Sequence, residues 1–231
     1  MNRPVSPAIP VDRPEELANL ITHGLGVLLA VAGTVAALLA AAATGSAIAV
    51  VSAAIFGGAL ILVYAASSGF HEAKLFGRPM PCRDRWRLLD HAAIYVLIAA
   101  TYTPIMLVSV GGAWGWSIVS IVWTLAAVGV TMKVFLVGRY DRFERIDTLL
   151  YLAMGWLCLV AIVPLWMSLT GAALAWLVAG GLFYSGGCVF FLWERLRFNH
   201  AIWHGFVLAG SACHWMAIVA NILPNAAASA G

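Results

Sequence analysis

Two histidines four residues apart stand at the start of an apolar segment, in the sequence "HAIWHGFVLAG" at residues 200–210. On a helix, side chains at positions i and i+4 lie on the same face, so the imidazoles of His200 and His204 can point toward one ligand. Zinc-binding helices use this spacing. Histidines at the start of a helix also occur as polar residues at an interface or as packing residues, and the spacing alone leaves these alternatives open.

Two further segments contain residues that suit a metal centre. "SSGFHEAK" includes Ser67 and His71, and "LLDHAAIYVLIAATYTP" includes Asp90. A catalytic zinc ion typically has three protein ligands and keeps one position for water, which matches His71, His200 and His204. Asp90 would then act on the bound water as a base, and Ser67 would add a hydrogen bond. Because zinc lowers the pKa of its water to about 7, this set predicts hydrolysis of an amide or ester bond.

The other histidines fit this centre less well. "HEAKL" at 71–75 is not a soluble metalloprotease helix, because Leu75 stands where that motif needs histidine. His214 lies about 15 Å beyond His204 along a helix, so we expect it to be hydrogen-bonded to a neighbouring helix. His91 follows Asp90 and points about 100° away from it, so we do not expect it to be a ligand.

Glu16, Asn19 and His23 recur at helical spacing close to the start of the first apolar segment. They could line the same polar vestibule as the predicted metal ligands. They could equally form the polar face of a helix start. The sequence does not choose between these interpretations.

The elements that carry these residues are strongly apolar. The chain has 231 residues, of which 63% are hydrophobic and 10% charged, and its mean hydropathy of +0.94 excludes an ordinary soluble domain. Stretches of about 20 apolar residues are long enough to cross a membrane. We place seven of them at residues 20–43, 47–70, 88–110, 116–137, 148–167, 173–193 and 200–221. They lack the alternating polarity of a transmembrane barrel, so the predicted fold is an all-α bundle of seven transmembrane helices.

The basic residues predict the orientation of this bundle. All thirteen Lys and Arg residues fall before the first stretch or near every second connection. They are Arg3, Arg13, Lys74, Arg78, Arg83, Arg85, Arg87, Lys133, Arg139, Arg142, Arg145, Arg195 and Arg197. The positive-inside rule therefore predicts a cytoplasmic N-terminus and a C-terminus outside. We expect a cytoplasmic tail over 1–19, a membrane domain over 20–221 and a non-cytoplasmic tail over 222–231, with no cleavable signal peptide.

This topology brings Ser67, His71, Asp90 and both histidines of the 200–210 segment to the cytoplasmic end of the bundle. Lys133 lies about one turn inside its stretch, so we expect its ammonium to reach the interface along its flexible stem. The net charge of +3 follows from the orientation and does not indicate nucleic-acid binding. The four cysteines have no paired spacing, so we expect no disulfide-linked partner. Membrane lipids are the expected partners. The sequence leaves open whether the chain forms a homo-oligomer.

Four motifs in this order resemble the bacterial hemolysin III proteins, a branch of the progestin and adipoQ receptor family. They are "ELANLITHG", "SSGFHEAK", "LDHAAIYVLIAATYTP" and "HAIWHGFVLAGSACHW". The resemblance implies a zinc ion near the cytoplasmic side, bound by His71, His200 and His204, with Asp90 at its water and Ser67 nearby. One departure is Phe70, where the family often has Tyr.

The family resemblance implies several functions. The family is similar in arrangement to alkaline ceramidases, which implies a zinc-dependent hydrolase of a lipid amide or ester in the bacterial inner membrane. The alternative is a receptor-like or membrane-homeostasis protein with structural zinc. A pore-forming cytolysin is the third candidate, and the uniformly apolar stretches fit it least because they are typical of permanently inserted helices.

Overall fold

The computed structural model describes residues 12–135 and 140–226, and these residues are helical throughout, apart from short connections. The elements are α1 (Arg13–Ala42), α2 (Ala47–Leu75), α3 (Met80–Pro104), η1 (Ile105–Val110), α4 (Gly112–Phe135), α5 (Tyr140–Gly155), η2 (Trp156–Ala161), α6 (Ile162–Ser168), α7 (Gly171–Phe191), α8 (Asn199–Trp215), η3 (Met216–Ile222) and η4 (Leu223–Asn225). Several of these follow one another without a break. The described residues thus contain seven helical segments long and apolar enough to cross a membrane, which confirms the predicted number.

Local sequence signals start and end these helices. Asp12 caps α1 by accepting a hydrogen bond from the backbone of Glu15, and Ser46 and Thr170 cap α2 and α7 in the same way. Such caps satisfy N–H groups that would otherwise be unpaired. Gly45 has a φ of 70°, which lets the chain turn sharply between α1 and α2.

The helices extend beyond the predicted apolar stretches at one end of the bundle. α1 begins at Arg13 rather than at residue 20, α2 continues to Leu75, and α3 begins at Met80. These extra turns carry polar and charged residues, which hydropathy does not assign to a span. As a result, Glu16 and His71 stand on regular helix. Arg3, Arg139 and the outer parts of both predicted tails, 1–11 and 227–231, lie outside the described residues.

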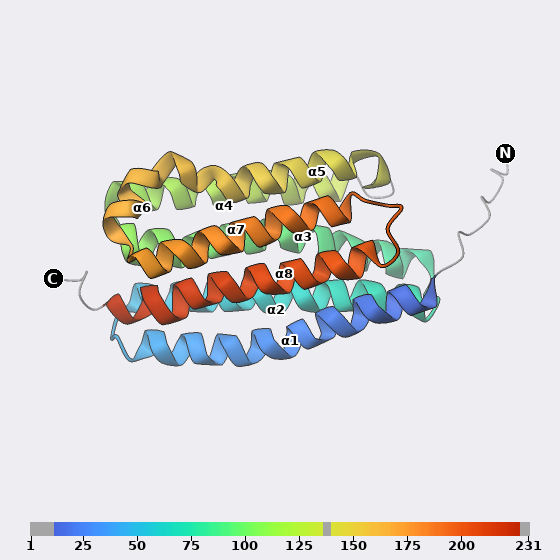
Figure 1. Ribbon diagram of the computed structural model, residues 1–231, viewed down its shortest axis with the longest axis horizontal. Helices are drawn as coiled ribbons and strands as arrows, with labels where there is room; N and C mark the ends of the chain where they lie inside the picture. The colour runs from blue at the N-terminus through green and yellow to red at the C-terminus, as the bar shows by residue number, and fades with distance from the viewer. Residues whose placement is uncertain (1–11, 136–139, 227–231) are drawn as a thin grey trace.

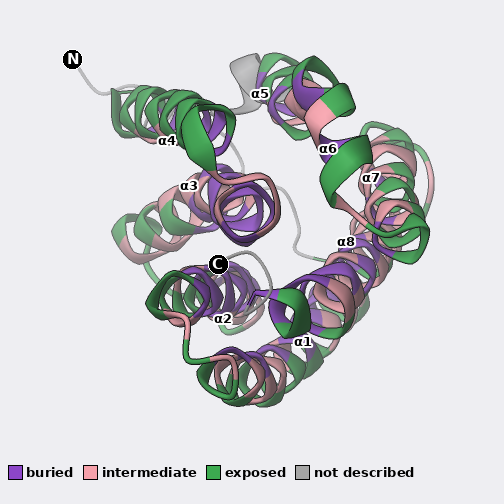
Figure 2. Cartoon of the chain, turned by 90° about the vertical axis from the view of Figure 1, so that its left-hand side faces the viewer, coloured by how far each residue is buried: buried purple, intermediate pink, exposed green. Residues whose placement is uncertain are grey.

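The helices run roughly along one common axis (Figure 1). α1 packs on α2, α2 on α3, and α3 on α4, while α8 packs on both α7 and α1. Viewed along the axis, buried residues gather on the inner sides of the helices and exposed residues on the outer sides (Figure 2). The ends of α2 and α7, and the starts of α1, α3 and α8, meet at the same end of the bundle (Figure 1).

The outer surface is apolar. Leu28 is 70% exposed and Leu39 is 67% exposed, and both lie on α1. Exposed leucine and valine side chains also recur along α2, α4, α5 and α7. A continuous apolar surface of this kind marks contact with lipid, and together with the seven spans it makes the chain an integral membrane protein.

Candidate metal centre

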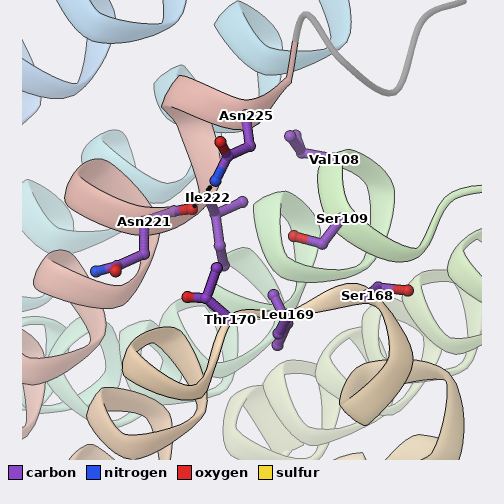
Figure 3. A pocket seen from close by; sticks show the side chains of 8 residues that line it. All are labelled: Val108, Ser109, Ser168, Leu169, Thr170, Asn221, Ile222 and Asn225. Carbon is purple, nitrogen blue, oxygen red and sulfur yellow. Dashed lines mark hydrogen bonds between the residues drawn. The ribbon is translucent and has the colours of Figure 1, made fainter.

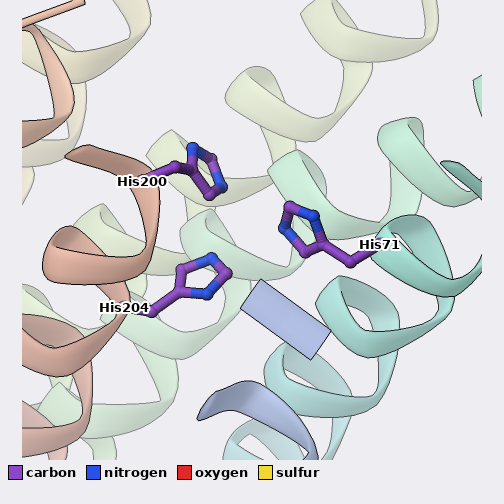
Figure 4. Close-up of side chains that lie close together, drawn as sticks. All are labelled: His71, His200 and His204. Carbon is purple, nitrogen blue, oxygen red and sulfur yellow. The ribbon is translucent and has the colours of Figure 1, made fainter. Parts of the chain in front are cut away.

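Three histidines from two helices meet at the polar end of the bundle. His71 comes from α2, and His200 and His204 come from adjacent turns of α8 (Figure 4). One ligand atom of each lies within 4.8 Å of the corresponding atoms of the other two. His71 and His204 are fully buried, and His200 is half-buried. The three residues proposed from spacing are therefore brought together, and the cluster could hold a metal ion.

Helix α1 supports this cluster from both sides, because it packs against α2 and α8. The carboxylate of Glu16 lies 2.7 Å from Nδ1 of His71 through its Oε2 atom. Its other oxygen pairs with the ammonium of Lys74, one turn beyond His71 on α2. Because a carboxylate accepts hydrogen bonds, Nδ1 of His71 donates, and Nε2 keeps its lone pair for a metal.

Thr22 plays the same part for His204. Its hydroxyl lies 2.9 Å from the carbonyl oxygens of Ala18 and Asn19 and 3.1 Å from Nδ1 of His204. A hydroxyl has one proton, and the carbonyls can only accept it. The hydroxyl therefore donates to its own helix and accepts from Nδ1 of His204, which again leaves Nε2 as the free lone pair.

The nitrogen atoms that have no hydrogen-bond partner indicate whether these residues suit a metal. Nε2 of His71, His200 and His204 is buried in each case and has no hydrogen-bond partner among the described residues. Buried polar atoms almost always have partners, and leaving one without costs about 1–3 kcal/mol. Three imidazole nitrogens are also the donor set of many zinc sites. The cluster thus fits a divalent metal in both geometry and chemistry.

Asp90 and Ser67 lie beside the cluster. Asp90, on α3, is 4% exposed, and Ser67, on α2, is fully buried. The Asp90 carboxyl lies within electrostatic range of His71 and near Ser67, whose buried hydroxyl has no hydrogen-bond partner among the described residues. Asp90 and His200 also line the same small cavity. An acidic group therefore lies next to the histidines.

The remaining histidines lie outside the three-histidine cluster. His214 has its Nε2 atom 3.3 Å from the carbonyl oxygen of Leu177 on α7, which confirms the expected bond to a neighbouring helix. His91 belongs to the cavity lining rather than to the cluster. His23 stacks on His204, with 3.4 Å between ring centroids, and is buried. The vestibule interpretation of Glu16 and His23 is therefore the better one, because both contact predicted ligands.

Thr22 was not anticipated from the sequence. The available signal was its place three residues beyond Asn19, which puts it on nearly the same helix face. The partner helix to which it points could not be read from that spacing. The four cysteines form no disulfide with one another among the described residues.

The expectation for Lys133 was wrong. Its side chain is 2% exposed, and its ammonium pairs with the carboxylate of Asp147 on α5 instead of reaching the interface. The hydroxyl of Tyr95 lies 3.4 Å from the same carboxylate. A nearby carboxylate inside the bundle stabilises the ammonium where it stands, so extension toward the interface has no advantage.

Comparison with known proteins agrees with this architecture. The family model described as "Haemolysin-III related" matches residues 11–215. The chain belongs to the haemolysin-III related family. The match includes all the residues of the histidine cluster and the supporting turn of α1.

Two bacterial members of the haemolysin-III related family are similar to the chain over almost its whole length. "Hemolysin-3" of Bacillus cereus is 44% identical over 212 residues, which cover 92% of this chain and 94% of that protein. "Hemolysin-3 homolog" of Bacillus subtilis (strain 168) is 43% identical, covering 89% and 93%. The human "Monocyte to macrophage differentiation factor" is 35% identical over 134 residues, covering 58% of this chain and 54% of that protein. The family resemblance drawn from the four motifs is confirmed.

Proposed function

We propose that this protein is a zinc-dependent hydrolase that cleaves an amide or ester bond of a membrane lipid. The observation that carries the proposal is the set of three buried Nε2 atoms without partners, two of which are oriented by Glu16 on His71 and Thr22 on His204. A structural zinc site normally has four protein ligands, whereas three leave a position for water. Asp90, beside the histidines, would supply the acidic group that hydrolysis also requires.

His71, His200 and His204 would hold the zinc ion. When bound, zinc polarises a carbonyl and lowers the pKa of water to about 7. Asp90, next to the histidines, would accept a proton from the attacking water and return it to the leaving nitrogen or oxygen. Ser67, beside Asp90, would hold that carboxylate or the substrate carbonyl in place by a hydrogen bond. Glu16 and Thr22 keep the imidazoles of His71 and His204 in the tautomer that binds metal through Nε2.

The same proposal includes a location. Most of the described basic residues lie on α2, α3 and the connections at the end of the bundle that holds the histidines; among them are Lys74, Arg78, Arg83, Arg85, Arg87, Arg195 and Arg197. By the positive-inside rule, this end faces the cytoplasm and the other end faces outward. The close bacterial relatives support a bacterial cytoplasmic membrane.

The test is to purify the protein in mild detergent, measure its metal by mass spectrometry, and incubate it with lipid extracts. We expect about one zinc ion per chain, since the cluster supplies a single set of three ligands. New fatty acids should appear with the native protein and not with Asp90→Asn, which should keep its zinc. Zinc-loaded native protein that releases no fatty acid from any membrane lipid would contradict the hydrolase.

One alternative also has support in the structure. The ligands come from α2 and α8, so a metal would tie two helices together without any chemistry. In that case Asp90→Asn would have no biochemical effect, whereas loss of a histidine would lower stability. The relatives' hemolysin names also suggest lysis of red cells, which a release assay with the purified protein tests directly.

A further inference from the structure

A small cavity adjoins the candidate metal centre. Side chains from α3, α4, α5, α7 and α8 enclose it, and it is partly open to the outside. Its lining includes Asp90 and His200 from the centre, together with Lys133 and Asp147 from the buried ion pair. The cavity thus joins two polar groups that are otherwise separate in the sequence.

The volume of the cavity, about 40 Å³, suits water rather than a lipid. One water molecule needs on the order of 10–15 Å³ of such space and two to four polar partners. Asp90, Lys133, Asp147 and Thr148 provide polar partners along the lining. A few water molecules therefore fit, whereas a lipid chain does not.

The ion pair gives an independent reason for water at this place. Lys133 and Asp147 are 2% and 4% exposed, yet both lie on segments that cross the membrane. Charged residues inside a membrane are costly, and they usually face a water-filled cavity or mark a polar pathway. The cost of burying this pair falls if water solvates the side that faces the cavity.

We propose that this cavity is a water-filled port through which water reaches the metal centre, and that the Lys133–Asp147 pair keeps it hydrated. The role of the port as a supply of water rests on the proposed function, because hydrolysis consumes one water molecule for each bond cleaved. The hydration of the port is a separate property, which a measurement without any substrate can determine.

Cys188 supplies a reporter, because this free cysteine lines the cavity. Methyl methanethiosulfonate is a small reagent whose methylthio sulfur is attacked by a thiolate, which forms a mixed disulfide and releases methanesulfinate. The thiolate forms in water and not in lipid. The reporter protein keeps Cys188 and replaces the other three cysteines by Cys82→Ser, Cys158→Ala and Cys213→Ala. Its rate of modification in membrane vesicles is followed by mass spectrometry of the intact protein.

The matched control is a cysteine at the same depth that faces outward. Val189 follows Cys188 on α7 and is 63% exposed on the outer surface. Val189→Cys, combined with Cys188→Ala in the same background, places a thiol against lipid. We expect Cys188 to react on the order of tenfold faster than this control. Equal rates, or a slower Cys188, would overturn the hydrated port.

A second variant tests the ion pair. Lys133→Met with Asp147→Leu replaces the pair by apolar side chains, an exchange that is often tolerated in buried pairs. We expect modification of Cys188 to slow to the rate of the lipid-facing control, with the metal content unchanged. An unchanged rate in a variant that keeps its metal would overturn the role of the pair. The comparison of Cys188 with the control does not require this variant, so misfolding of the variant leaves the hydrated port testable.

The modification rate of Cys188 and the assay of lipid hydrolysis can fail independently of each other. Fast modification of Cys188 in a protein that hydrolyses no lipid would contradict the hydrolase and leave the hydrated cavity in place. Hydrolysis by a protein whose Cys188 reacts no faster than the lipid-facing control would contradict the port alone.

Discussion

The two ends of the bundle both contain a pocket, and the smaller pocket belongs to the end with the reactive groups. At the end remote from the histidines, a cavity of about 240 Å³ lies between η1, the start of α7 and the last helical turns. Ser109, Thr170, Asn221 and Asn225 line it (Figure 3). The cavity beside the metal centre measures only about 40 Å³.

The two ends differ in how their polar groups are satisfied. At the remote end, the side-chain amides of Asn221 and Asn225 donate to backbone carbonyls 2.9 and 2.7 Å away, and the lining carries no charge. At the histidine end, the buried Nε2 atoms of His71, His200 and His204 have no hydrogen-bond partner among the described residues, and the same is true of both ring nitrogens of His23. Pocket size is a usual first guide to a site. In this molecule, buried nitrogen atoms with an unpaired lone pair are the better guide, because the fold leaves them available to bind a metal.

The largest effect is expected from removing a histidine. His204→Ala should abolish retention of metal after dialysis, because two remaining ligands cannot hold zinc against competition. Metal analysis of the purified protein measures this. Asn221→Ala, at the remote end, is the control and should retain metal as the native protein does. Equal metal contents in the two variants would break the distinction between the ends.

The next largest effect is expected at the ion pair. Lys133→Met removes the only ammonium paired with the buried carboxylate of Asp147 among the described contacts, which should destabilise the protein by about 3–5 kcal/mol. Unfolding in mild detergent by heat or denaturant measures the change. The double replacement of Lys133 and Asp147 by Met and Leu should recover most of the loss. A single variant as stable as the native protein would show that the pair is not a buried structural contact.

A smaller effect is expected from Glu16, which orients His71. Glu16→Ala should weaken zinc binding by about 10–100-fold, as is typical when the hydrogen-bond partner of a metal-binding histidine is removed. Competition with a zinc-chelating dye measures the affinity. Glu15→Ala is a matched control, because Glu15 is the adjacent carboxylate and makes no contact with His71. If both variants bind zinc alike, Glu16 does not position the ligand.

The smallest effect is expected from Thr22. Thr22→Val keeps the shape of the side chain and removes the oxygen that accepts from His204. A neutral hydrogen bond contributes about 0.5–1.5 kcal/mol, so zinc affinity should fall roughly 2- to 13-fold in the same dye assay. Thr34→Val removes a hydroxyl that bonds only its own helix and should leave the affinity unchanged. A loss of the same size in both variants would point to a general effect on α1.

The sequence by itself determined the number of membrane spans and the choice of the three histidines. Both depend on local properties: hydropathy over about 20 residues, and the i to i+4 spacing on a helix. The alternation of crossing directions then placed His71 at the same end as His200 and His204. The family motifs strengthened this choice, and the structure brings the three side chains together.

Only the tertiary structure decided which side chains surround these histidines. Glu16 meets His71 across 55 positions of sequence, and Thr22 meets His204 across 182 positions. Such contacts depend on the rotation of each helix about its axis, which packing against several neighbours sets together. Lys133 illustrates the same limit: its position near a helix end suggested contact with water. Asp147, on the neighbouring helix, stabilises its charge inside the bundle instead.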